Sequence, residues 1–232
     1  MLPAPMISLR QILGQHGPIL VLDAASTRVQ VGLLRADADA IWKQPGEDAG
    51  KSLFAGTKAC LDEAKIGVDA VNGFAFCDGP GSMLGIRTAA MAIRTWLVLR
   101  PRPVFRYSSL TLLAHHLLRS DRGNFSVIAD ARRDSWHLAS VEGGNVSPLR
   151  RAASAELAGS GEKLVLPSSF RAWSHSPRAT VDAPYAVAGL LATEADTPLF
   201  SATDAPDGYQ AEPPTYKKWS AQVHSRDTVA HS

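Results

Sequence analysis

The sequence predicts an α/β fold, and three observations carry this prediction. Two short apolar segments, residues 19–23 and 28–34, flank a tight turn and are typical of a β-hairpin. Two repeats of an amphipathic helix followed by a buried strand come next, and such alternation is typical of α/β proteins. The 232 residues are 45% hydrophobic and 20% charged, which provides enough apolar side chains for a packed core.

The first half of the chain contains the clearest elements. Ile19–Asp23 is an apolar run that ends in an acid, and Arg28–Leu34 partly alternates, as a half-buried strand does. A weaker strand is expected over Ala40–Lys43, with Pro45-Gly46 as its end. Apolar spacing and N-cap residues then predict a helix over 48–65, a strand over 73–77, a helix from Ser82 to Arg100 and a strand over 103–107.

The second half gives a weaker pattern. Ser108 or Ser109 is expected to cap a helix that ends at Leu118. Phe125–Asp130 and Trp136–Val141 then read as a hairpin. Beyond residue 143 we expect only a strand over 163–166 and a helix near 183–195.

Four regions follow from these patterns. Residues 1–17 read as a flexible N-terminal extension, and residues 18–107 as a first subdomain that part of 185–232 completes. Residues 108–184 form a second subdomain, although no obvious linker marks the boundary. Residues 197–232 contain four prolines and are expected to be irregular.

Composition restricts the function. The net charge of +2 does not indicate a broad basic surface for nucleic acid or membrane binding. Two cysteines are too few for a fold held together by several disulfides. The start of the sequence lacks the pattern of a secretory signal, and no apolar run approaches the roughly 20 residues of a membrane helix. We therefore expect a cytoplasmic protein without membrane contact.

Two glycine-containing segments resemble phosphate-binding motifs. Residues 46–52 end in Gly-Lys-Ser like a P-loop, but the glycine spacing is one residue short and two acids lie within it, so a polar loop before a helix is the better interpretation. Gly79-Pro-Gly81-Ser-Met-Leu-Gly85 does not have the spacing of a dinucleotide fingerprint. It does place a glycine turn between a strand and a helix N-terminus, where anions bind, although the glycines could also serve the turn alone.

A second segment gives this glycine loop a context. Asp23 ends a strand and Ser26-Thr27 follow in the turn, while Asp78 precedes a loop that continues to Arg87. Together these two segments resemble the TsaB (YeaZ) family, whose sequences carry a D-T-S-T strand end and a G-P-G-S-F-T-G-x-R loop. Further similarity lies, in order, at Ser108-Ser109-Leu110, at Asp130-Ala-Arg132 with Trp136, and at residues 211–216.

The resemblance implies an actin-like, RNase H-like fold of two subdomains with mixed sheets flanked by helices. It also implies a non-catalytic subunit that binds and stabilises TsaD, which transfers a threonylcarbamoyl group to the adenosine beside the tRNA anticodon. A TsaE-type ATPase is the expected further partner, a homodimer is an alternative assembly, and tRNA contact is at most indirect.

The same resemblance assigns candidate site residues. No cofactor is required, but ATP or ADP could bind at vestigial phosphate loops formed by Asp23, Ser26, Thr27, Gly79, Gly81 and Ser82. Family members pair through their two N-terminal helices, which places the interface at Phe54, Thr57, Leu61, Met83, Arg87, Ala90, Met91 and Arg94. Ala24 and Ala25 replace T-S, and Met83-Leu84 replace F-T, and these departures could narrow a phosphate site.

No catalytic constellation or metal site is recognisable in the sequence. His115 and His116 are adjacent and so point about 100° apart on a helix, which prevents them from sharing one metal as an i,i+4 pair can. Cys60 and Cys77 read as packing residues. Asp23, Asp78 and Asp130 each end a strand and could approach one cleft, or they could satisfy turn amides.

Two alternatives to the TsaB-type function remain open: an actin-like phosphotransferase, and a divergent protein with another partner.

Overall fold

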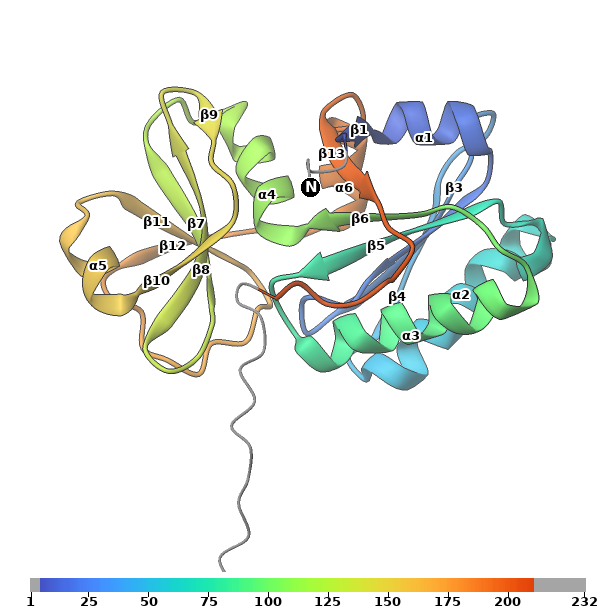
Figure 1. The fold of residues 1–232 in the computed structure, drawn as a ribbon, viewed down its shortest axis with the longest axis horizontal. Helices are drawn as coiled ribbons and strands as arrows, with labels where there is room; N and C mark the ends of the chain where they lie inside the picture. The colour runs from blue at the N-terminus through green and yellow to red at the C-terminus, as the bar shows by residue number, and fades with distance from the viewer. Residues whose placement is uncertain (1–4, 211–232) are drawn as a thin grey trace, which may run out of the picture.

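In the computed structural model, residues 5–210 are described, and they form two mixed sheets that lie end to end (Figure 1). The first has seven strands in the order β1-β13-β6-β5-β2-β3-β4. Its strands are β1 (Ile7–Ser8), β2 (Ile19–Asp23), β3 (Val29–Leu34), β4 (Ile41–Gly46), β5 (Gly73–Gly79), β6 (Val104–Ser108) and β13 (Pro198–Ala202).

The second sheet has six strands, all between residues 125 and 183. Its path is β10-β8-β7-β11-β12, with β9 paired to β8. Its strands are β7 (Phe125–Asp130), β8 (Ser135–Glu142), β9 (Asn145–Val146), β10 (Arg150–Ala153), β11 (Lys163–Pro167) and β12 (Thr180–Ala183). Each sheet contains parallel and antiparallel pairs, as the predicted mixed α/β architecture requires.

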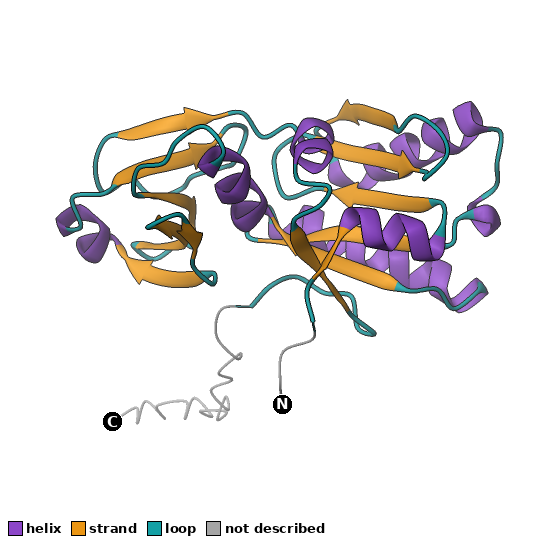
Figure 2. Cartoon of the chain, turned by 90° about the horizontal axis from the view of Figure 1, so that it is seen from above, coloured by secondary structure: helices purple, strands orange, loops and turns teal. Residues whose placement is uncertain are grey.

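Helices cover both faces of the first sheet (Figures 1 and 2). The helices α2 (Ala49–Ala64) and α3 (Met83–Leu99) share one face and pack beside each other. On the other side lie α1 (Leu9–His16), α4 (Ser109–Leu118) and α6 (Val187–Thr193). The small α5 (Ser154–Gly159) packs beside β10 of the second sheet, and a short 3₁₀ turn, η1, spans Val68–Ala70.

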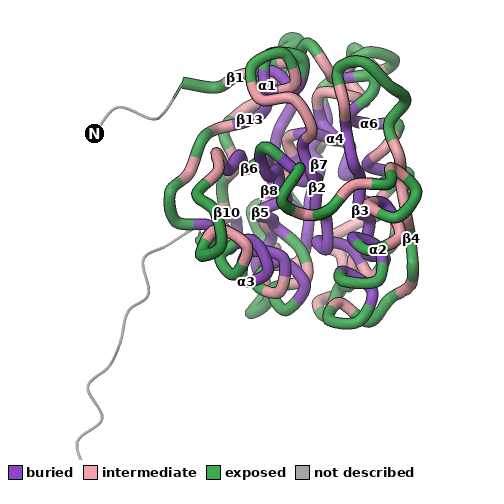
Figure 3. The backbone as a smooth tube through the Cα atoms, turned by 90° about the vertical axis from the view of Figure 1, so that its right-hand side faces the viewer, coloured by how far each residue is buried: buried purple, intermediate pink, exposed green. Residues whose placement is uncertain are grey.

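The core extends through both sheets, as the buried segments in Figure 3 indicate. The largest apolar cluster joins Val21 and Phe105 of the first sheet to Val127 and Val165 of the second, with α4 contributing Leu113. A second cluster lies under α2 and α3, where Leu53 and Ile93 meet the strands.

Three expectations at the edges of the chain are wrong. Residues 7–16 form a strand and a helix, so the expected flexible extension does not apply to the described part of 1–17. Likewise, β13 lies within the segment expected to be irregular, whose residues 211–232 fall outside the described range. The strand at 41–46 also includes Pro45, because β4 is an edge strand, where the missing N–H of proline is tolerated.

Candidate functional site

The parallel strands β2, β5 and β6 bring the two predicted phosphate loops to one edge of the first sheet. β2 pairs with β5, and β5 with β6, so Asp23, Asp78 and Ser108 end adjacent strands. Ligands of α/β proteins bind outside such carboxyl ends. The predicted glycine turn follows β5, and Ser82 caps α3 as expected, since its side chain accepts the Gly85 N–H.

The two loops lie directly against each other. The Ser82 N–H donates to the Ala25 carbonyl at 2.7 Å, so an oxygen of the protein already occupies the approach to the helix terminus. A Cβ added at Gly81 would lie 2.3 Å from the Ala25 oxygen, and one at Gly85 would lie 2.2 Å from the Ala24 oxygen. The predicted loops are thus in direct contact with each other at Gly81, Ser82 and Gly85.

The hydroxyl-bearing residues of the first loop serve the turn itself. The Ser26 hydroxyl donates to the Arg28 carbonyl and accepts the Arg28 N–H, which closes a local turn. The Thr27 N–H donates to the carbonyl of Ser169 at 2.7 Å, and this bond connects the first loop to the loop that follows β11 in the second sheet. Ser26 and Thr27 are thus brought to the expected edge but are engaged within the protein.

Asp23 is fully buried and fully bonded. Its Oδ2 accepts the hydroxyls of Tyr107 at 2.7 Å and Tyr185 at 2.8 Å, while its Oδ1 accepts the Ala25 N–H. Burial raises the pKa of this carboxyl, and the hydrogen bonds only partly offset that effect. A magnesium ion needs open carboxylate oxygens, so Asp23 does not fit the metal-bound nucleotide that an actin-like phosphotransferase would use.

Asp78 is also buried, but it has a cationic partner. Its carboxylate faces Arg106, with 3.3 Å between Oδ2 and a guanidinium nitrogen. Burial raises the pKa of Asp78 to about 7, and the attraction of Arg106 lowers it only in part. The backbone carbonyl of Asp78 accepts the Tyr209 N–H, so this strand end also anchors the segment after β13.

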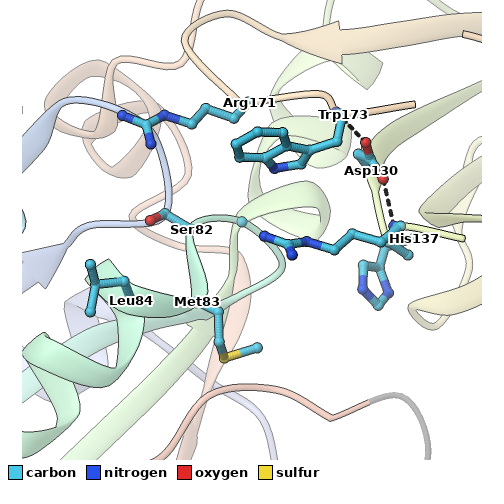
Figure 4. A pocket seen from close by; sticks show the side chains of 10 residues that line it. Ser82, Met83, Leu84, Asp130, His137, Arg171 and Trp173 are labelled. Carbon is cyan, nitrogen blue, oxygen red and sulfur yellow. Dashed lines mark hydrogen bonds between the residues drawn. The ribbon is translucent and has the colours of Figure 1, made fainter. Parts of the chain in front are cut away.

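Asp130 lies apart from Asp23, in a cleft between the two sheets. The cleft has a volume of about 560 Å³, and Figure 4 shows Ser82, Met83 and Leu84 of α3 together with side chains of the second sheet around it. The Asp130 carboxylate accepts backbone N–H groups of Arg132 and Ser174, as turn-amide satisfaction predicts. The three acids therefore do not share one open cleft.

The face of α2 and α3 that points away from the sheet carries an apolar groove of about 300 Å³. Phe54 and Met91 line it and are 52% and 58% exposed, and Arg87 borders it. Of the other predicted interface residues, Met83 and Arg94 are exposed and Leu61 is half-buried. Figure 3 shows exposed segments along the outer sides of both helices.

Two predicted interface residues are not on this surface. Thr57 and Ala90 are buried within the chain, and Ala90 belongs to the apolar cluster under the two helices. Their assignment as surface residues is wrong. The groove is instead completed by residues that the sequence analysis did not select, namely Leu84, Thr88, Ala92 and Thr95. The i, i+4 spacing of Leu84, Thr88, Ala92 and of Met91, Thr95 could have identified that stripe.

Other candidate chemical groups have structural roles. Cys60 and Cys77 are buried free thiols, as predicted. Asp48 caps α2 by accepting the Lys51 N–H, so the P-loop-like segment is a polar loop before a helix. Among residues 5–210, no group of three His, Cys, Asp or Glu side chains could hold a metal, and no helix is long and apolar enough to cross a membrane.

Comparison with known proteins places this fold. No protein-family model and no curated protein matches the sequence. Two solved structures are similar over most of the chain: YeaZ from Pseudomonas aeruginosa, and an uncharacterized protein described as similar to the peptidase YeaZ from Pseudomonas aeruginosa. Each is 21% identical, aligns with 77% of this chain and 90% of its own, and has a TM-score of 0.56. The chain therefore has the fold of YeaZ, which confirms the two-sheet architecture predicted from its sequence.

Proposed function

We propose that this chain is a TsaB-type subunit that uses the α2–α3 face to bind and stabilise a TsaD-type partner. That partner would carry out threonylcarbamoyl transfer to tRNA in the cytoplasm, with a TsaE-type ATPase as a further component. The proposal is supported by the YeaZ fold together with the ordered sequence similarity from Asp23 to Arg132.

The apolar groove on α2 and α3 is the observation that carries the proposal. Phe54, Leu84 and Met91 each expose more than half of their side-chain surface, and they lie together on one face. Contiguous exposed apolar side chains mark interaction sites, especially when polar groups border them. Arg87 and Arg94 are exposed on the same helix; Arg94 lies 3.8 Å from Asp207 within the chain, so Arg87 is the cation that would pair with an acidic group of a partner.

A non-catalytic role is supported by the contacts of the two loops. The loops contact each other at Ser82 and Ala25, and the carboxylate of Asp23 is bonded to two tyrosines. Phosphotransfer would need both groups to be open to a nucleotide and magnesium. We therefore propose that no nucleotide is needed for the chain's own contribution.

Size exclusion with light scattering tests the proposal on the chain alone and mixed with the TsaD-type protein of the same organism. We expect one stable mixed complex. Met91→Asp and Arg87→Glu should abolish it while the circular dichroism spectrum is unchanged, because both side chains are exposed. Arg122→Glu, which reverses an exposed charge before β7, is the matched control and should bind normally.

Separate elution of the two proteins, with and without the TsaE-type protein and ATP, would contradict the proposal. In that case a divergent role with another partner would become the better interpretation. The same experiment on the chain alone measures whether it forms the homodimer that the resemblance allows.

A further inference from the structure

The cleft between the sheets carries an exposed aromatic ring with one guanidinium group over it and a second arginine from the same loop in the cleft lining. Trp173 is 68% exposed, and the Arg132 guanidinium carbon lies 5.4 Å from the centre of its ring. Arg171 comes from the same loop as Trp173, and Figure 4 shows both side chains at the cleft across from Ser82 and Leu84. Trp and Arg are among the side chains most enriched at binding hot spots, so their combination at one cleft indicates a candidate ligand site.

Asp130 anchors the backbone that carries the ring. The Trp173 and Ser174 N–H groups both donate to Oδ2 of this carboxylate, while the Arg132 N–H donates to Oδ1 at 2.5 Å. One carboxylate thus fixes the hairpin turn and the loop after β11 relative to each other. The backbone that carries the exposed ring is therefore anchored, and the ring itself contacts the Arg132 guanidinium.

The charge of the cleft is positive. Asp130 is the only carboxylate among the described residues that line it, and backbone N–H groups and the Ser174 hydroxyl already occupy its oxygens. Burial and the nearby Arg151 lower the pKa of His137 to about 4, so this ring is neutral at pH 7. Within the described residues, neither Arg132 nor Arg171 has a carboxylate in salt-bridge distance. Both cations are available to an anionic ligand.

We propose that this cleft binds single-stranded nucleic acid, with one base stacked on Trp173 and the adjoining phosphates paired with Arg132 and Arg171. Stacking on an aromatic side chain combined with arginine contacts to phosphate is the usual mode for single strands. A free small ligand is usually enclosed by its site, whereas this ring lies at an open rim that a strand can cross. The exposed Arg133 in the same turn extends the basic surface beyond the cleft.

Fluorescence anisotropy with a labelled octaadenylate RNA tests this site on the full chain at 50 mM salt. The wild-type chain should bind, and Trp173→Ala should weaken binding by roughly 10-fold or more, the range expected for loss of one stacked base. Arg171→Ala should weaken binding and reduce the slope of log affinity against log salt by about 0.7, the value for one lost phosphate contact on a single strand.

Arg122→Ala is the matched control, because it removes an exposed arginine at the opposite end of β7 from Asp130. It should leave the affinity close to that of the wild-type chain. Absence of binding, or equal loss for Arg122→Ala and Arg171→Ala, would overturn the proposal. Competition by AMP at equal phosphate concentration would also overturn it, because a free nucleotide would then be the ligand. None of these outcomes depends on the TsaD-type partner, so they are separate from the test of the proposed function.

Discussion

At the residue scale, Gly81 and Gly85 allow the first loop to lie against the start of α3. Gly81 has a φ of +155°, and the Ala24 and Ala25 carbonyls approach both glycines more closely than a methyl group would permit. The close contact accounts for the bond from the Ser82 N–H to the Ala25 carbonyl. The sequence analysis expected these glycines to serve either an anion or the turn, and the contacts favour the turn.

The contact between Gly85 and the Ala24 carbonyl predicts that alanine, usually favourable in a helix, is destabilising at this position. Gly85→Ala should destabilise the fold by about 1–3 kcal/mol, because the new Cβ would lie 2.2 Å from a backbone oxygen. Gly14→Ala in α1 is the matched control: nothing lies within 4 Å of its Cβ, and it should stabilise by about 0.5–1 kcal/mol. Urea unfolding of both variants measures the two free energies. If both variants were stabilised to the same extent, the first loop would have to be able to move away from α3.

Asp78 predicts a pH dependence of stability. Its pKa is raised from 3.8 to about 7 in the fold, so the folded state holds this proton more tightly than the unfolded chain. Its contribution to stability is therefore fully present below about pH 4 and declines as the pH rises to 7. Relative to Asp78→Asn, the wild-type protein should lose roughly 2–3 kcal/mol of unfolding free energy between pH 5 and pH 8. A constant difference across this range would contradict the raised pKa.

At the scale of elements, β1 and α1 are integral parts of the first sheet. β1 pairs antiparallel with β13, and the Arg10 N–H donates to the Ala195 carbonyl, so the two ends of the described chain hold each other. Leu9 and Ile12 are buried against the core. Ser8 and Gln11 form a capping box at the start of α1.

Removal of one apolar contact tests this docking. Ile12→Ala should destabilise the protein by about 2–5 kcal/mol, because Ile12 is fully buried in the main apolar cluster. Gln15→Ala, at an exposed position of the same helix, should change stability by less than about 0.5 kcal/mol. Equal small effects in thermal and urea unfolding would mean that residues 7–16 behave as the flexible extension that the sequence alone indicated.

The elements differ in how well local pattern reveals them. α2, α3 and α4 were predicted because their apolar stripes are long and Asp48, Ser82 and Ser108 are strong N-caps. α1 has only eight residues, and β1 has two. β1 is stabilised by pairing with β13, whose partner residues lie 190 and 193 positions later, and no local window contains both. The same reasoning applies to Asp23, whose tyrosine partners at 107 and 185 are distant in sequence.

At the scale of the whole molecule, the two sheets share one apolar core. α4 begins directly after β6 and packs against β7 and β8, so its buried face belongs to both sheets. Gln30 of β3 also bonds to the backbone of Tyr185 and Val187, which joins the first sheet to the segment leaving the second. Two subdomains can thus be distinguished by their sheets, while one apolar cluster extends through both.

A continuous core predicts one cooperative unfolding transition. Trp136 is fully buried in the second sheet and Trp96 packs under the first, so tryptophan fluorescence reports on both. Replacing both Trp42 and Trp96 by Phe leaves Trp136 as the buried reporter of the second sheet among the described residues, and its urea midpoint should coincide with that of the far-ultraviolet circular dichroism signal. Residues 108–184 expressed alone should fail to fold, because Leu112 and Leu113 of α4 and Val127 of β7 would lose their partners from the first sheet. Two separated transitions, or a folded isolated fragment, would show instead that the sheets are independent units, and the cleft between them would then be free to open and close around a bound strand.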